Sequence, residues 1–209
     1  MADEKHNSEL SEELSEELSE ETGEFQSFAN HFLIAMPGLD DPFFHHTVTY
    51  VCEHNEDGAM GLIINQPIGM TVASLLEQID VEITHNRNFD DLQVLTGGPV
   101  ATDRGFVLHP PQEGWRSSLQ LSSEIMITTS RDILEALGSD RAPQKFLLTL
   151  GYAGWEAGQL EEELADNSWL TIPADANLMF TTPTAERWGK AAESLGFEIG
   201  QLSSQAGHA

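Results

Sequence analysis

The sequence of 209 residues contains a single cysteine, Cys52, so a framework of intramolecular disulfide bonds is excluded. This scarcity fits a reducing compartment. No apolar run approaches the roughly 18 residues that a membrane-spanning helix needs. The first 21 residues are acidic and polar, and so resemble neither a secretory signal nor an Arg-rich transit peptide. These absences predict a soluble cytoplasmic protein without a membrane partner.

Basic residues are also scarce, since 9 Lys and Arg stand against 35 Asp and Glu, for a formal charge of −26. The first 24 residues hold ten of the acids and one lysine, and the other 185 residues still carry a charge of −17. Proteins that hold nucleic acids neutralise phosphates with clustered Lys and Arg. The basic residues here are scattered along the chain, which argues against direct binding to nucleic acid.

An acidic repeat occupies residues 8–21, where a Ser-Glu-Glu-Leu unit recurs and places Leu10, Leu14 and Leu18 on one helical face. A helix this short is marginal in water, and its glutamates repel one another. Two interpretations follow: residues 1–24 are a disordered, solubilising extension, or they form a short helix that docks on a partner. With a frayed tail over residues 201–209, this leaves one domain over residues 25–200.

Hydrophobic periodicity predicts short strands separated by turns, with a smaller number of helices. The Asp-Gly pair at 57–58 predicts a hairpin. Thr71 and Thr182 are candidate helix N-caps. Expected strands are 32–36, 47–54, 59–65, 92–95, 104–109, 119–121, 125–129, 145–150, 169–172 and 178–180; expected helices are 70–79, 131–137, 159–165 and 183–195. Connections too short for crossovers predict an α+β fold with a mixed, largely antiparallel sheet and about four helices.

Cys52 and His54 are the first candidate pair for chemistry, because residues two apart on a strand share a face. Their Cα atoms would stand roughly 7 Å apart, whereas a nucleophile and its base need about 3 Å. A lone cysteine in an apolar strand is more typical of a small buried side chain.

A metal site would have to draw on the histidines and the nearby acids. None of these residues shows a spacing such as His-Glu-x-x-His. His45 and His46 would point to opposite faces if they lay on a strand. The pool comprises His45, His46, His54, His109, Asp40, Asp41 and Glu53. The sequence predicts neither a metal site nor a cofactor.

Two glycine-rich segments could bind an anion. Gly97 and Gly98 follow a strand, where they could form an anion-binding nest or supply a tight turn or bulge. The segment from Gly151 to Trp155 is expected to be a turn between a strand and a helix, a place where phosphate-binding loops occur. Its spacing matches no nucleotide motif, and the glutamates at 161–163 would repel a phosphate. Tyr152 and Trp155 are therefore expected to be packing or contact residues.

Several segments in order resemble the YqgE/AlgH family. They are Leu-Ile-Ala-Met-Pro-Gly-Leu-Asp-Asp at 33–41, Glu-His at 53–54, Gly-Ala-Met-Gly-Leu-Ile-Ile-Asn-Gln-Pro at 58–67, Gly-Gly-Pro-Val at 97–100, Phe-Val-Leu-His at 106–109, Gly-Tyr-Ala-Gly-Trp at 151–155 and Gly-Gln-Leu-Glu at 158–161. The resemblance implies a bacterial cytoplasmic protein with one α+β domain around a mixed, barrel-like sheet. Members are often labelled transcriptional regulators by association with alginate control. The resemblance implies no catalytic residues and no established activity.

Two hypotheses compete. In the first, the protein is a non-enzymatic regulatory or interaction protein that binds protein partners. In the second, it is an enzyme or a binder of a small molecule or metal, with a site near Glu53, His54, His109 and the Gly151–Trp155 segment. The candidate functional surface comprises Asp40, Asp41, Glu53, His54, Asn65, Gly97, Gly98, His109, Tyr152 and Trp155. The sequence leaves the oligomeric state open.

Overall fold

The computed structural model describes residues 25–84, 89 and 91–196. The expected acidic extension and frayed tail lie outside the described residues. The strands are β1 (His31–Ala35), β2 (Val48–Asn55), β3 (Gly58–Ile63), β4 (Pro67–Thr71), β5 (Gln93–Thr96), β6 (Val100–His109), β7 (Ser118–Gln120), β8 (Met126–Thr128), β9 (Leu147–Glu156) and β10 (Trp169–Pro173). The helices are α2 (Val72–Gln78), α3 (Arg131–Leu137), α4 (Gln159–Ala165), α5 (Ala176–Phe180), the 3₁₀ helix η1 (Thr184–Glu186) and α6 (Arg187–Ser194). None of the described helices is long and apolar enough to cross a membrane.

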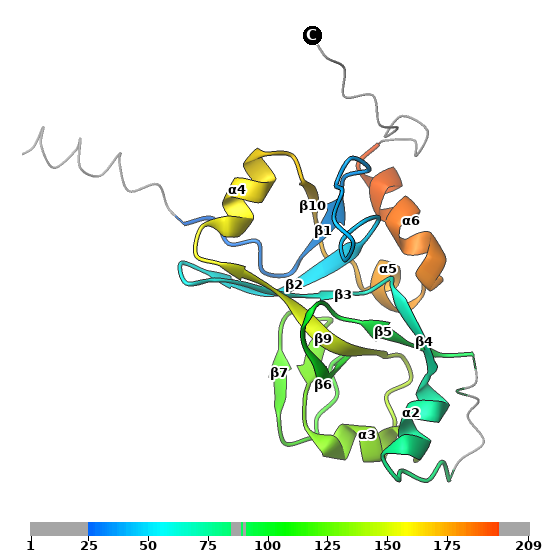
Figure 1. The fold of residues 1–209 in the computed structure, drawn as a ribbon. Coiled ribbons are helices and arrows are strands. Elements are labelled where there is room, and N and C mark those ends of the chain that lie inside the picture. The colour runs from blue at the N-terminus through cyan, green and yellow to red at the C-terminus, as the bar shows by residue number, and fades with distance from the viewer. Residues whose placement is uncertain (1–24, 85–88, 90, 197–209) are drawn as a thin grey trace, which may run out of the picture.

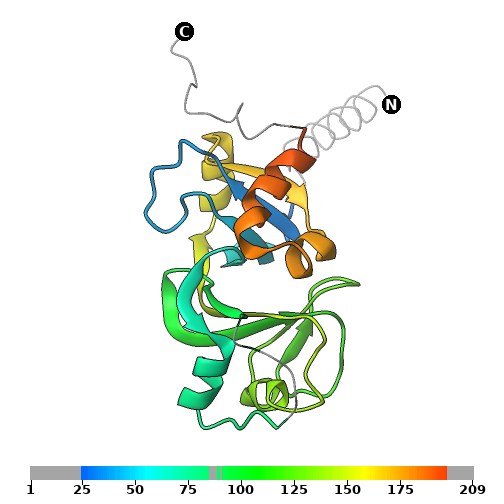
Figure 2. The same cartoon turned by 90° about the vertical axis from the view of Figure 1, so that its right-hand side faces the viewer.

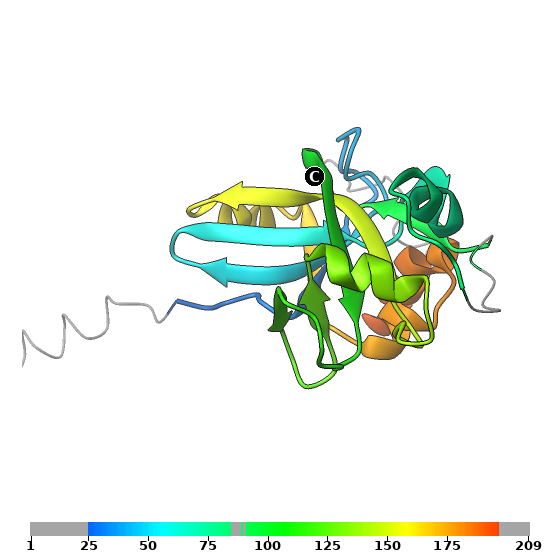
Figure 3. The same cartoon turned by 90° about the horizontal axis from the view of Figure 1, so that it is seen from below.

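One curled sheet connects all the strands, in the order β10-β1-β2-β3-β9-β6-β8-β7, with β5 pairing β9 and β4 pairing β5. The β5–β9 pair is parallel, and the other described pairs are antiparallel. Strand β9 runs through the middle of the molecule and joins its two halves (Figure 1). Seen from below, the β2–β3 hairpin extends alongside β9 (Figure 3). The predicted α+β fold with a mixed, largely antiparallel, barrel-like sheet is confirmed.

Strand β1 explains the continuous apolar run at 32–36, because it is buried on both faces. Phe32 and Ile34 pack with residues of α5 and α6, including Met179 and Ala191. Leu33 and Ala35, on the other face of β1, pack with Leu160 of α4 and with Trp155 and Trp169. Helices α4 and α6 accordingly flank this end of the sheet from opposite sides (Figure 1).

A second core lies at the other end of the molecule, under α2 and α3 (Figure 2). The predicted cap is confirmed: the Thr71 hydroxyl accepts the backbone N–H of Ser74 at 3.1 Å and satisfies a donor that the helix leaves unpaired. Leu76 of α2 and Ile133 of α3 point into this core. The predicted start and end of α3 are also confirmed, with Gly138 at its C-terminus.

Helix α6 is fastened to the ends of two strands. The Arg187 guanidinium donates to the carbonyl oxygens of Ile64 and Thr182, and the Trp188 indole donates to Ala35 at 3.0 Å. Burial lowers the pKa of Arg187 to about 10, which still leaves it charged at neutral pH. The buried cation therefore serves as a donor to backbone oxygens of two separate segments.

Two predictions near the C-terminus are wrong: a strand and a helix cap. Residues 178–180 lie in helix α5, not in a strand, because Asp175 caps that helix by accepting the Leu178 N–H at 2.7 Å. The helix expected over 183–195 is present, as η1 followed by α6 from Arg187, but Thr182 caps neither. Among the described residues five α-helices flank the sheet, in line with the expected number of about four.

Candidate interaction groove

A β-bulge in β2 separates the two residues that the sequence placed on one face. The pairing of β2 with β3 shifts between Val51 and Glu53, so Cys52 is the extra residue. Cys52 consequently faces the core that contains Phe106, while His54 faces the opposite side. The prediction of a shared face for Cys52 and His54 is wrong, because the bulge changes the alternation of side chains.

The side of the sheet that Cys52 faces carries a groove of about 270 Å³. Its walls come from the β2–β3 hairpin and from β6, β7 and β8, and in Figure 1 β7 lies below that hairpin. The apolar side chains that line it are Cys52, Met60, Phe106, Leu119, Leu121 and Ile127. Leu119 is 62% exposed, the largest fraction among the exposed large hydrophobic residues of the described part. The groove is thus an apolar surface that the described chain does not cover.

Strand β7 forms one border of the groove and is an edge of the sheet. Just beyond the two strand ends, Thr129 donates to the Ser117 oxygen at 3.0 Å and Leu121 donates to the Ile125 oxygen at 3.0 Å. By the alternation of an antiparallel pair, Leu119 is the β7 residue whose backbone bonds to β8. Ser118 and Gln120 lie on either side of Leu119, and their backbone N–H and C=O groups point away from β8. Within the described residues, no other strand pairs with this edge.

Two opposite charges lie at the groove. The Arg104 guanidinium carbon lies 5.2 Å from the centre of the Phe106 ring, a cation–π arrangement. Among the described residues, no carboxylate lies within ion-pair distance of Arg104, since the three ion pairs found there involve other residues. The Glu53 carboxylate accepts a hydrogen bond from the Asn55 amide at 3.1 Å. Both charges remain able to bind an external group.

Cys52 is not built as a nucleophile. Burial raises the pKa of its thiol, and the nearby Glu53 carboxylate raises it further. A thiolate is the reactive form, so this thiol is held in its unreactive state. Cys52 therefore contributes a small apolar surface to the groove.

His54 lies across the sheet from the groove, beneath the start of the described chain. Its Nδ1 accepts the Phe28 N–H at 2.9 Å, and its ring lies between Phe25 and Phe28. Its Nε2 lies 2.9 Å from Oε1 of Glu161, which is within ion-pair distance but outside hydrogen-bond geometry. These contacts attach residues 25–29 and α4 to the β2–β3 hairpin.

His109 is also fully buried but in another environment. Its Nδ1 lies 2.7 Å from the Pro110 oxygen and its Nε2 lies 2.9 Å from Oγ1 of Thr128, which lies 2.7 Å from Oγ of Ser118. Burial lowers the pKa of His109, and the hydrogen bond to Pro110 opposes this shift in part. The chain of polar atoms connects β6, β8 and β7.

The two aromatic candidates have structural partners. The indoles of Trp155 and Trp169 donate to the same oxygen of Glu163, at 2.9 and 2.8 Å. Tyr152 packs edge-on against Phe106, with ring centres 6.1 Å apart. Trp155 therefore holds α4 against the sheet, and Tyr152 supports the core beside the groove.

The remaining polar candidates shape loops. Asp41 accepts the N–H groups of Phe43 and Phe44 at 2.8 and 3.0 Å, while Asp40 is exposed beside it. Asn65 accepts the Val48 N–H and donates to the His46 oxygen, both at 2.8 Å, and so continues the pairing of β2 with β3. These contacts account for Asp41 and Asn65 without a ligand.

His45 and His46 depart from the sequence expectation. They lie in a turn, and His46 has a left-handed backbone (φ 54°), so their rings lie against each other with centres 3.9 Å apart and planes tilted by 38°. The prediction that they point to opposite faces assumed a strand and is wrong. In the described part of the chain, no three His, Cys, Asp or Glu side chains gather into a metal-binding group.

The glycine candidates allow two backbones to touch. A Cβ atom on Gly97 would lie 2.0 Å from the Gly151 oxygen, and one on Gly98 would lie 2.2 Å from the Tyr152 carbonyl carbon. The expected turn at 151–155 is wrong, because these residues continue β9. Gly151 (φ 75°) permits the bend that keeps the strand paired on both sides of this contact.

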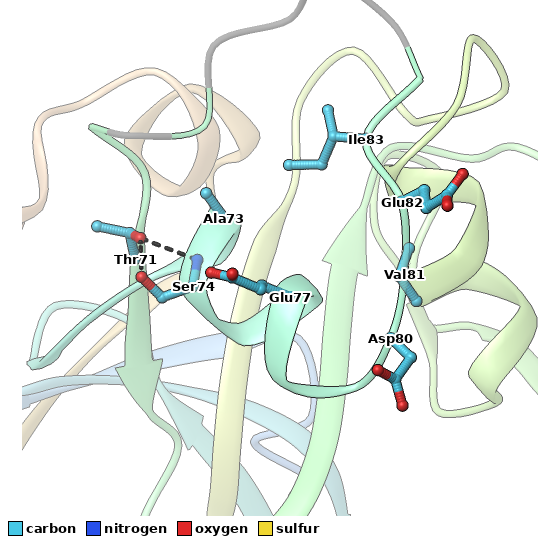
Figure 4. Close-up of a pocket in the computed structure, with 8 residues that line it drawn as sticks. All are labelled: Thr71, Ala73, Ser74, Glu77, Asp80, Val81, Glu82 and Ile83. Atoms are coloured by element: carbon cyan, nitrogen blue, oxygen red, sulfur yellow. Dashed lines mark hydrogen bonds between the residues drawn. The ribbon is translucent and has the colours of Figure 1, made fainter.

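A larger, open hollow of about 590 Å³ lies beside α2. Its charged lining is acidic: Glu77, Asp80 and Glu82. Figure 4 shows that these carboxylates lie at separate places around the hollow and do not converge on one point. The groove beside β7 is smaller, but its apolar walls and two charges are closer to the composition of a binding site.

The sequence was compared with models of known protein families. A model of AlgH-like proteins matches residues 32–200. The chain belongs to the AlgH-like family. This AlgH-like chain is 61% identical to a UPF0301 protein of Idiomarina loihiensis over 183 residues, which cover 88% of the chain and 99% of that protein. A UPF0301 protein of Pseudoalteromonas translucida is 59% identical over 184 residues, covering 88% of the chain and all of that protein.

Solved structures agree with the fold of this AlgH-like chain. The solution structure of AlgH from Pseudomonas aeruginosa is 50% identical, with a TM-score of 0.70 over 88% of the chain and all of that protein. The crystal structure of DIP2367 from Corynebacterium diphtheriae is 17% identical, with a TM-score of 0.63 over 81% of the chain and 88% of that protein, and shows the fold alone.

The AlgH-like fold brings few of the sequence candidates together. Glu53 lies at the groove and Tyr152 supports its wall, whereas His54, His109 and Trp155 contact separate sets of residues. Sequence reasoning missed Arg104, Met60 and Leu119 as site residues. The available signal was weak: 119–121 was a predicted strand, but a single Leu in a short strand is usually buried.

Proposed function

We propose that this AlgH-like protein is a non-enzymatic interaction protein that binds a partner protein at the groove beside β7. The observation that supports this most is the exposed Leu119 beside apolar walls at a free sheet edge. Exposed apolar surface flanked by polar groups is typical of protein-binding sites. We further propose that the protein acts in the cytoplasm and that any regulatory role proceeds through protein contacts, since a charge of −26 disfavours DNA.

The chemistry-bearing side chains support binding over catalysis. The Cys52 thiol is held protonated, the His109 ring spans two strands, and His54 secures a chain segment. Catalysis by either histidine would require breaking contacts that hold the fold, and catalysis by Cys52 would require ionising a thiol whose pKa is raised. A role as an interaction protein uses only surface that the described chain leaves open.

Quantitative affinity capture from extracts of the source organism tests this proposal, with three forms of the full chain. Leu119→Asp places a charge in the groove, and Ile68→Asp places one at another exposed aliphatic residue (40% exposed) outside the groove. We expect a stoichiometric partner with the natural chain and with Ile68→Asp, and its loss with Leu119→Asp. A partner retained equally by all three forms would place the interaction elsewhere.

A further inference from the structure

We propose that the partner binds by strand addition: an extended, cationic segment pairs with β7 and places an aliphatic side chain in the groove beside Leu119. This inference rests on the proposed function and specifies how the same site is used. Three observations support it: the bonding groups of β7, the face on which Leu119 lies, and the charge of the chain.

The outer side of β7 carries backbone bonding groups that β8 does not use. The outward N–H and C=O groups of Ser118 and Gln120 form a row that another strand can pair with. Gln120 is exposed and Ser118 is half-buried, so both are accessible from the edge. Recognition of this kind takes its affinity from main-chain hydrogen bonds.

The register of the added strand follows from the pleat. Residues directly opposite each other on paired strands point to the same face. A residue opposite Leu119 would therefore face the groove, together with Ile127 and Phe106 behind it. Its neighbours would face the other side, so specificity falls on alternate residues of the segment.

The net charge of the chain favours a partner segment of positive charge. The chain carries −26 overall, and an acidic protein attracts cationic segments and repels a second copy of itself at long range. Glu53 at the groove can receive a Lys or Arg of the segment, and Arg104 can receive a carboxylate or a backbone oxygen. A polypeptide segment with a net positive charge and aliphatic residues at alternate positions therefore matches both the apolar groove and the negative charge of the protein.

The decisive variant is Gln120→Pro, compared with Gln120→Ala. Proline removes the outward N–H of residue 120, which β8 does not use, and is tolerated at such edge positions. Alanine removes the same side chain and keeps the N–H. Both variants should have circular dichroism spectra and melting temperatures like those of the natural chain.

The probe is a fluorescent, acetylated peptide of four Lys-Val repeats, measured by anisotropy at about 0.15 M salt to limit long-range attraction. A peptide of four lysines followed by four valines controls for charge. We expect the alternating peptide to bind more tightly than this control, Gln120→Pro to weaken binding by about tenfold or more, and Gln120→Ala to change it less than about twofold. Equal binding by the two Gln120 variants would overturn strand addition.

Further outcomes separate this inference from the proposed function. If Leu119→Asp loses the captured partner while Gln120→Pro keeps it, the groove binds a partner without strand addition and this inference fails alone. If the full chain sediments as a dimer that Gln120→Pro dissociates, the occupant is a second copy and the cationic partner is wrong. If Gln120→Pro does not fold, two N-methylated forms of the probe peptide replace it, one methylated on the backbone nitrogens of the valines and one on those of the lysines. Only one of the two sets of N–H groups faces β7, so we expect one of these peptides to lose binding. Unchanged binding of both peptides would overturn the inference.

Discussion

Nε2 of His109 lies 2.9 Å from Oγ1 of Thr128, and both side chains are completely buried. The Pro110 oxygen can only accept, so Nδ1 of His109 donates to it and Nε2 must accept from the Thr128 hydroxyl. The Thr128 oxygen then accepts from Ser118. These partners fix the neutral tautomer, and protonation of Nε2 would reverse its hydrogen bond with Thr128, so that the Thr128 and Ser118 hydroxyls would have to reorient.

This arrangement predicts that the fold loses stability in mild acid. Burial lowers the pKa of His109 below its usual 6.5, so the unfolded chain binds its proton first as pH falls. The contribution of His109 is fully present above pH 6.5 and is lost as pH falls toward its folded pKa. Urea unfolding measured at pH 7.5 and at pH 5.5 should show that the free energy of unfolding falls less between these two pH values for His109→Gln than for the natural chain. Equal losses would show that His109 does not carry this dependence.

Glu163→Ala should destabilise the fold by about 2 kcal/mol, because it removes the shared acceptor of two buried indole N–H groups. Glu163→Gln should cost less, since its amide oxygen can still accept. Glu162→Ala is the matched control, as Glu162 is exposed on the same helix. Chemical denaturation measures all three, and a loss from Glu162→Ala as large as that from Glu163→Ala would refute the role of the indole contacts.

Gly97→Ala should prevent folding or cost about 3 kcal/mol or more, because its Cβ would lie 2.0 Å from the backbone oxygen of Gly151. Gly154→Ala is the matched control on β9, where the nearest atom to a new Cβ is a Tyr152 ring carbon at 3.5 Å. Thermal unfolding of both variants distinguishes backbone contact from a general intolerance of alanine. Similar melting temperatures for the two variants would contradict the contact.

The Cys52 thiol should react at least about tenfold more slowly with a disulfide reagent in the folded protein than in urea, since its raised pKa and burial both limit thiolate attack. The reaction is followed by the absorbance of the released thiolate, with free cysteine as the reference. A rate in the folded protein near that of free cysteine would mean that the groove exposes a reactive sulfur.

Much of the fold could be predicted from sequence because local signals agreed with tertiary packing. The Asp-Gly pair specified the β2–β3 hairpin, and Thr71 specified the start of α2. The strand prediction at 178–180 was wrong because a short apolar run does not distinguish a strand from one helical turn. The segment is helical because Asp175 accepts the Leu178 N–H and caps the helix. The continuation of β9 through Gly151 depends on backbone contact with Gly97, which lies far away in the sequence.

The candidate site was less predictable for the same reason. The bulge at Cys52 moves Glu53 and His54 to faces that simple alternation does not give. The exposure of Leu119 depends on β7 being the last strand of the sheet, which is a property of topology rather than of local sequence. Arg104 becomes a groove residue only because β6 and the β2–β3 hairpin, which lie apart in the sequence, line the same groove.

Photo-crosslinking in living cells tests most directly whether the groove beside β7 binds a partner. A photoreactive amino acid replaces Leu119 in one form of the full chain and Ile68 in the other, which matches it as an exposed aliphatic position outside the groove. The account predicts discrete covalent adducts of defined mass from position 119 and none of the same masses from position 68. Identical adduct patterns from the two positions, or no adduct from position 119, would contradict it.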